Sequence, residues 1–251
     1  MIVAVVAAVH YLLLKKYVIK DWDSKGEIKD EKAVENAPTD KSEKDIGIKP
    51  QEVEKKNEKP PMEAERPLTY RNAVMGDISG IPSSREATSG ILFDASSRNV
   101  LWAKNPRNAV PVASMTKIMT ELLVFEALEK SDKYNMQTPI QVTRTAYKIG
   151  GSQVYLDPKE TFPLEELMKC IMISSANDAA QLVAEFFGGG SVEVFVAQMN
   201  KRAKELHLSS TRFSNPTGLP ANDPNNDNVS SPEAMASAMV TSLMVAAPRT
   251  A

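Results

Sequence analysis

Charged and apolar residues are unevenly divided along this chain, and only its C-terminal part can build a hydrophobic core. Residues 20–66 contain 14 Asp/Glu, 11 Lys/Arg and a single aromatic residue, Trp22. Such a segment buries too little apolar surface to offset the entropy of ordering it. Its four prolines and its lack of apolar periodicity argue against the alternative of one long charged helix. We therefore expect a disordered tether at 20–66 and a folded domain at 67–251.

Residues 1–19 predict a hydrophobic signal-anchor that attaches the chain to a membrane. The run 1–14 is apolar except for His10, and Lys15 and Lys16 follow it. The run is shorter than the roughly 20 residues that span a bilayer, although lysine side chains can reach the interface. Lysines after the run argue against a cleaved signal peptide, and positive-inside logic would keep the following chain cytoplasmic, so topology stays open. The alternative, a buried helix, has no adjacent core to join.

The composition of the whole chain argues against several classes of function. With 30 Lys+Arg against 32 Asp+Glu, the net charge of -2 provides no field for holding nucleic acid. A single cysteine, Cys170, excludes an intramolecular disulfide, and two histidines leave too few ligands for structural zinc. No metal or organic cofactor is implied. A Ser-His-Asp triad would need His207, so a serine nucleophile in this domain is expected to use another base.

Residues 67–251 carry the pattern of an α+β domain. Two apolar strands flank a polar turn in 89–103, which predicts an antiparallel hairpin. A helix is expected at 114–130, where apolar residues form one stripe. Ser230 to Glu233 reads as a capping box before a last helix. Strands followed by helices indicate helices packed on an antiparallel sheet. The other predicted helices are 163–173, 178–187, 191–206 and 234–245.

The sequence Ser114-Met-Thr-Lys117 at the start of the first long helix is a candidate catalytic pair. Residues three apart lie on one helix face, so the Lys117 amine can approach the Ser114 hydroxyl. A neutral lysine could then accept the serine proton in place of a histidine. On this pair alone, the alternative is that Ser114 caps the helix and Lys117 is solvated.

Ser175-Ala-Asn177 lies at a break between two predicted helices and is a second candidate. A hydroxyl there can relay a proton, and the Asn177 amide can hydrogen-bond a substrate amide. The alternative is an ordinary turn between helices, with Asp178 as the helix cap.

Four ordered segments together resemble the serine-type D-alanyl-D-alanine carboxypeptidases of peptidase family S11, which are low-molecular-mass penicillin-binding proteins. The resemblance covers about 86–244, and several ordered motifs are more specific than one S-x-x-K. It implies the β-lactamase/penicillin-binding-protein (serine transpeptidase-like) fold. The segments are VASMTKIMT at 112–120, GSQVYL at 151–156, SANDAA at 175–180 and SNPTGLP at 214–220.

The resemblance also implies an activity and a role for each candidate residue. Ser114 would attack the penultimate D-alanine of a peptidoglycan stem peptide ending in D-Ala-D-Ala, with Lys117 as base and release of the terminal D-alanine. Ser175 would pass the proton to the leaving amine, Asn177 would hold the substrate amide, and the Ser114 N–H would supply half of the oxyanion hole. β-Lactams would inhibit by acylating Ser114. The enzyme would work in cell-wall synthesis and cell shape, outside the cytoplasmic membrane.

One family motif is missing from the 251 residues. No K-T-G or close variant occurs, and Pro216-Thr-Gly218 belongs to a different segment of the family pattern. We therefore expect the domain at 67–251 to lack the K-T-G strand and to be incomplete at its C-terminus, with exposed strand edges. Such a chain could be a fragment or a natural truncation.

Two other functions remain open at this point. One is a non-catalytic relative that binds cell-wall peptide or penicillin; the other is a class A-like β-lactamase, for which no deacylating glutamate is apparent. The remaining reactive residues are expected to be structural. Cys170 should be a buried, inert thiol, His207 an exposed residue after a helix, and the methionines core filler.

Overall fold

The computed structural model describes residues 67–246, and the predicted anchor (1–19) and tether (20–66) lie outside them. A small sheet begins the domain, with strands β1 (Val74–Met75), β2 (Gly90–Phe93) and β3 (Val100–Lys104) in the order β1-β3-β2. Strands β2 and β3 form the predicted antiparallel hairpin. Strand β1 runs parallel to β3, so the sheet is mixed rather than antiparallel throughout. The connection 76–89, which contains helix α2 (Pro82–Glu86), carries the chain from β1 past β3 to β2 on the other side of the sheet.

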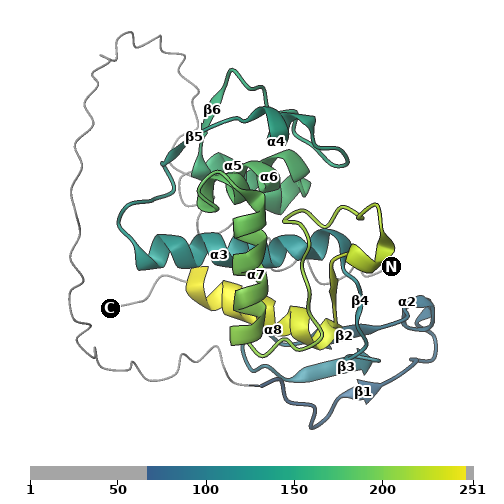
Figure 1. Cartoon of the computed structure of the whole chain (residues 1–251). Coiled ribbons are helices and arrows are strands. Elements are labelled where there is room, and N and C mark those ends of the chain that lie inside the picture. Colours follow the sequence, from purple (N-terminus) through teal and green to yellow (C-terminus); the bar gives the residue numbers. More distant parts are fainter. Residues whose placement is uncertain (1–66, 247–251) are drawn as a thin grey trace, which may run out of the picture.

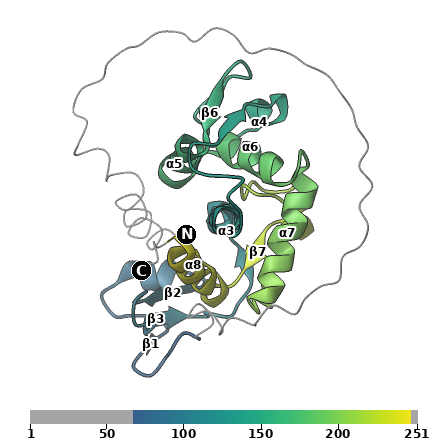
Figure 2. The same cartoon turned by 90° about the vertical axis from the view of Figure 1, so that its left-hand side faces the viewer.

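Helix α3 (Lys117–Lys130) is the central element of the domain, and the 3₁₀ turn η2 (Ala113–Thr116) precedes it. The predicted helix at 114–130 is thus confirmed, with its first turn wound more tightly. Helix α8 (Pro232–Ala246) packs between α3 and β2, and Figure 2 shows α3 end-on between α8 and the remaining helices. Phe93, Met119, Leu122 and Met235 are buried in the core on this side of α3.

A second core lies on the opposite side of α3. It is built from the antiparallel pair β5 (Pro139–Gln141) and β6 (Thr161–Pro163), from α5 (Leu164–Ser174) and from α6 (Asn177–Phe187). Helix α4 (Arg144–Lys148) covers α6 in the upper part of Figure 1. Because α3 is enclosed from both sides, even polar residues on it are buried.

The later helices match their predicted positions within one or two residues. Helix α7 (Val192–Glu205) is capped by Ser191, and it crosses α3 in Figure 1. The predicted capping box at Ser230–Glu233 is wrong by one residue. Ser230 lies in strand β7 (Val229–Ser230), which pairs with β4 (Val110–Pro111), and the Ser231 hydroxyl instead accepts from the Ala234 N–H. Strand pairing takes Ser230 out of the cap position.

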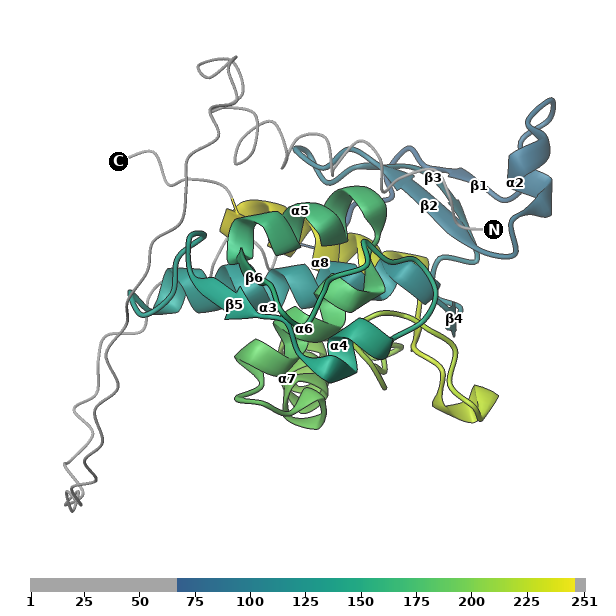
Figure 3. The ribbon, with the colours of Figure 1, turned by 90° about the horizontal axis from the view of Figure 1, so that it is seen from above.

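Strand β2 is an edge of the sheet within residues 67–246, as Figure 3 shows beside α8. Apolar side chains are exposed around this sheet: Val74 by 52%, Met75 by 58%, Leu92 by 46% and Leu101 by 50%. In the same residues no single helix is long and apolar enough to cross a bilayer; only α6 and α7 together, bent by 87°, pass that test.

Candidate active site

The turn that carries Ser114 is held in an unusual backbone conformation. Ala113 has a φ of 45°, in the left-handed region that an alanine seldom adopts. Strain of this kind persists only where surrounding contacts enforce it, and it gathers at functional sites. The Met115 N–H donates to the Val112 carbonyl, which closes the turn at 3.0 Å. Ser114 is left exposed at the start of α3.

Lys117 is buried directly behind Ser114, with only 3% of its surface exposed. Its Nζ lies 3.3 Å from Ser114 Oγ, 2.8 Å from Asn177 Oδ1 and 2.7 Å from the Thr217 carbonyl oxygen. The structure therefore brings three sequence-predicted residues, Ser114, Lys117 and Asn177, into one cluster. The alternative of a solvated Lys117 is wrong.

The partners of Lys117 also determine where its lone pair lies when the amine is neutral. A neutral amine has two N–H groups and one lone pair, and the Thr217 and Asn177 oxygens can only accept hydrogen bonds. The Asn177 orientation is set by Nδ2, which donates to the Gly150 carbonyl at 2.8 Å. Both N–H groups are thus used, and the lone pair faces Ser114 Oγ. This arrangement would suit Lys117 to take the Ser114 proton, and its role as base stays a prediction.

We expect acylation of Ser114 to accelerate as the pH rises through about 8. Burial lowers the pKa of Lys117 from 10.5 to about 8, against the opposing charge of Glu121. Only the neutral amine can accept the proton, so the rate constant should rise from acid pH to a plateau. Measuring β-lactam adduct formation against pH tests this, and a rate that is independent of pH between about 6 and 9 would contradict it.

The same pKa shift should be visible in the stability of the domain. Between about pH 8 and 10.5, the unfolded Lys117 side chain binds a proton that the folded one does not. The free energy of unfolding contributed by Lys117 therefore rises with pH across that window. The free energies of unfolding of the wild type and of Lys117→Met can be measured with urea at several pH values across this window. Their difference isolates the contribution of Lys117, because the two proteins share all other titrating groups.

Ser175 and Asn177 occupy the break between α5 and α6. Ser175 ends α5 with a φ of 53°, and this left-handed residue turns the chain so that α6 begins at Asn177. Asn177 is 4% exposed, and its backbone N–H donates to the Ser152 carbonyl at 2.7 Å. Ser175 is partly exposed and its hydroxyl makes no hydrogen bond within residues 67–246. Its role in proton transfer, and the contact of Asn177 with substrate, stay predictions.

The segment 150–156 is hydrogen-bonded to the start of α6. The buried Asp178 carboxylate accepts from the backbone N–H groups of Val154 and Leu156, at 3.1 and 3.2 Å. At Gly151, with a φ of 81°, an added Cβ would come within 2.5 Å of Asn177 Nδ2. The alternative of an ordinary turn with Asp178 as the helix cap is therefore wrong, because Ala176 occupies the cap position and the main contacts of Asp178 join α6 to residues 154–156.

Residues 214–220 lie against the nucleophile turn, which is η2 (Ala113–Thr116) with the predicted nucleophile Ser114. Gly218 has a φ of 83°, and a Cβ placed there would lie 1.8 Å from the Ala113 carbonyl oxygen. The Asn215 side chain closes the loop by accepting from the Thr217 and Gly218 N–H groups. Thr217 enters the site through its carbonyl oxygen, which no side-chain pattern can reveal. Sequence reasoning therefore missed it.

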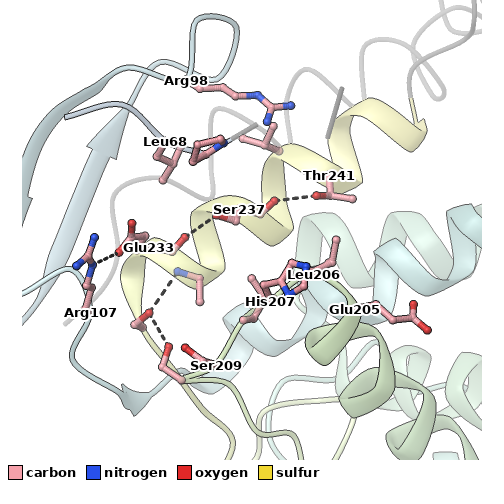
Figure 4. A pocket seen from close by; sticks show the side chains of 16 residues that line it. Leu68, Arg98, Arg107, Glu205, Leu206, His207, Ser209, Glu233, Ser237 and Thr241 are labelled. Atoms are coloured by element: carbon pink, nitrogen blue, oxygen red, sulfur yellow. Dashed lines mark hydrogen bonds and ion pairs between the residues drawn. The ribbon is translucent and has the colours of Figure 1, made fainter. Parts of the chain in front are cut away.

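His207 is not part of the Ser114 cluster. It is exposed and lines a separate pocket of about 390 Å³ between the end of α7 and α8, where Arg107 pairs with Glu233 at 2.9 Å (Figure 4). The expectation that the serine uses another base is consistent with this placement.

Cys170 is only half-buried rather than fully buried, and burial raises the pKa of its thiol, which keeps it protonated. Residues 67–246 contain no group of three potential metal-ligating side chains.

Comparison with known proteins decides the family. Residues 78–249 match the peptidase S11 family model, described as D-alanyl-D-alanine carboxypeptidase. The chain belongs to peptidase family S11. Among S11 relatives, it is 46% identical over 155 residues to the D-alanyl-D-alanine carboxypeptidase DacF of Bacillus subtilis, covering 61% of this chain and 39% of the relative. It is 37% identical over 144 residues to DacC of Escherichia coli, covering 55% and 36%.

The S11 assignment also confirms the predicted fold. The crystal structure of the D-alanyl-D-alanine carboxypeptidase DacD from Francisella tularensis superimposes with a TM-score of 0.57 at 27% identity. That match covers 62% of this chain and 36% of the other. The predicted serine transpeptidase-like α+β fold is therefore right. The chain spans less than half the length of the curated S11 relatives it matches.

Proposed function

We propose that this chain is a serine-type D-Ala-D-Ala carboxypeptidase that trims the terminal D-alanine from peptidoglycan stem peptides. The observation that carries the proposal is the contact set of Lys117, which aims the amine lone pair at an exposed Ser114. Membership of family S11 supports the same reaction. β-Lactams, as substrate mimics, are the expected inhibitors.

The proposed reaction uses Ser114 as nucleophile and Lys117 as base. Ser114 Oγ attacks the carbonyl of the penultimate D-alanine while its proton passes to Lys117 Nζ. The C–N bond to the terminal D-alanine then breaks, and the leaving amine takes a proton, relayed by Ser175. Water hydrolyses the ester on Ser114 and frees the enzyme. The Ser114 N–H would stabilise the oxyanion in both steps.

Covalent labelling of the chain tests this function. We expect a β-lactam to add its full mass to the folded protein, and peptide mapping to place the adduct on Ser114 rather than on Ser175. Incubation with a peptide ending in D-Ala-D-Ala should release D-alanine. An adduct-free chain with an intact thermal transition would argue for the non-catalytic relative. Rapid hydrolysis of the β-lactam would argue for a β-lactamase.

Attachment to the outer face of the cytoplasmic membrane is part of the proposal. Its support is the apolar run 1–14 followed by Lys15 and Lys16, together with a substrate that lies outside the cytoplasm. Fractionating cells that express the full chain or a version without residues 1–19 should show membrane association only for the full chain. Accessibility of the full chain to external protease should show on which side it lies.

A further inference from the structure

Residues 214–220 run along the face of α3 that carries the base. The Thr217 carbonyl accepts from Lys117 Nζ at 2.7 Å, and the Pro216 carbonyl accepts from Thr120 Oγ1 at 2.8 Å. Lys117 and Thr120 are three residues apart and share one helix face. Two successive carbonyls of this loop, those of Pro216 and Thr217, therefore accept hydrogen bonds from two side chains on one face of the helix. The position of the loop sets the position of one of the two acceptors that orient Lys117.

Asn228 holds this loop from behind. Its side chain is 2% exposed, and its Oδ1 accepts from the backbone N–H groups of Ser214 (2.6 Å) and Asn215 (3.2 Å). Its Nδ2 donates to the Asn215 carbonyl and to Thr116 Oγ1, both at 2.9 Å. Thr116 is the last residue of the 3₁₀ turn η2 and immediately precedes Lys117, the first residue of α3. One buried amide thus joins the start of the loop to the turn of the helix that carries the base.

We propose that Asn228 is a positioning residue for Lys117. It touches neither Ser114 nor the Lys117 amine, but it fixes the loop whose Thr217 carbonyl occupies one N–H of the base. Without its side chain, the N–H groups of Ser214 and Asn215 lose the acceptor that fixes them beside the buried Asn228 position, so the loop is free to shift and to pair with water. Lys117 then loses the fixed acceptor and gains access to solvent. The catalytic consequence rests on the proposed function, whereas the effect on Lys117 itself does not.

Titration of Lys117 in the Asn228→Ala variant tests the proposal without any substrate. The midpoint can be followed by NMR of the full chain labelled with ¹⁵N-lysine, assigned with Lys117→Met. The charged group that acts on Lys117 is Glu121 on the same helix. The Asp178 carboxylate on α6 accepts from backbone N–H groups. Residues 214–220 contain no titratable side chain, so a shift of this loop brings no new charge to Lys117. We expect the midpoint to move upward, because water reaches the amine. An unchanged or lower midpoint would overturn the proposal.

Asn200→Ala is the matched control. The Asn200 side-chain amide hydrogen-bonds the backbone of Phe213, as the Asn228 amide does with residues 214–215. Its Oδ1 accepts from the Phe213 N–H at 2.9 Å, and its Nδ2 donates to the Phe213 carbonyl at 2.7 Å. It holds the residue just before the loop, and its side-chain hydrogen bonds within residues 67–246 go only to Phe213 and to the Val196 carbonyl. The Lys117 midpoint should stay at its wild-type value in this variant. An equal shift in both variants would mean general loosening and would refute a specific role for Asn228.

A milder variant and a kinetic measurement complete the test. Thr116→Val removes one acceptor of Asn228 at nearly constant volume, and it should shift the Lys117 midpoint in the same direction. This variant replaces Asn228→Ala in the test if Asn228→Ala does not fold. Acylation by β-lactam should slow by about 10²-fold in Asn228→Ala, as expected for a misplaced catalytic group. The pH at which the acylation rate rises should move upward together with the Lys117 midpoint. If the wild type does not acylate, the proposed function fails, and the titration still decides the role of Asn228.

Discussion

Replacing Lys117 by methionine is expected to slow the acylation of Ser114 by about 10²–10⁴-fold, which is the usual contribution of a general base. The variant loses the amine 3.3 Å from Ser114 Oγ, and no other base contacts that hydroxyl within residues 67–246. Methionine is apolar and similar in length, so the site should remain filled. The rate constant for β-lactam adduct formation, measured by mass spectrometry over time, gives the effect.

Stability measurements distinguish lost chemistry from lost structure in this variant. Lys117 is 3% exposed, and burying an ammonium group is costly, so its removal should leave the thermal midpoint near or above the wild-type value at neutral pH. Lys204, an exposed residue of α7, provides the control: Lys204→Met should change neither property. A Lys117→Met protein that acylates at the wild-type rate would remove Lys117 from the mechanism.

Replacing Gly218 by alanine is expected to destabilise the domain by about 3 kcal/mol and to abolish acylation. The added Cβ would lie 1.8 Å from the Ala113 carbonyl oxygen and 2.9 Å from the Ser114 nitrogen. Both contacts are with backbone, so no side-chain rotation can relieve them. The nucleophile turn or the loop must move, and either movement breaks the contact between Thr217 and Lys117. Urea unfolding measures the first effect and adduct formation the second.

Gly189→Ala separates this clash from the cost of the backbone conformation. Gly189 has a φ of 67°, also left-handed, but nothing lies within 4 Å of an added Cβ. The control should cost only about 1 kcal/mol and leave acylation intact. Equal losses of stability in the two variants would show that the nucleophile turn accommodates a side chain at 218.

Much of the secondary structure could be predicted, because local patterns are strong in this chain. The hairpin at 89–103 has a polar turn between apolar strands, and the long helices have continuous apolar stripes. The short strands β1, β4 and β7 could not be predicted, since two residues contain no periodicity. The predicted cap at Ser230 is wrong for a related reason. Pairing with β4, a segment distant in sequence, places Ser230 in a strand and leaves Ser231 as the cap.

The sequence by itself determined which residues are candidates for chemistry. The spacing of Ser114 and Lys117 places them on one helix face whatever surrounds them, and the scarcity of histidine favours a lysine base. The Asn177 amide lies at a helix break, in a segment whose order with the other motifs resembles a known family, and this pattern makes it a candidate.

Only the tertiary structure decided how these residues act. The burial that lowers the pKa of Lys117 comes from two cores that enclose α3, and its second acceptor is the backbone carbonyl of Thr217, 100 residues away in sequence. Asn228 and Gly218 matter through contacts with segments far along the chain. Burial and backbone hydrogen bonds depend on which segments meet in space, and no local pattern of side chains encodes them.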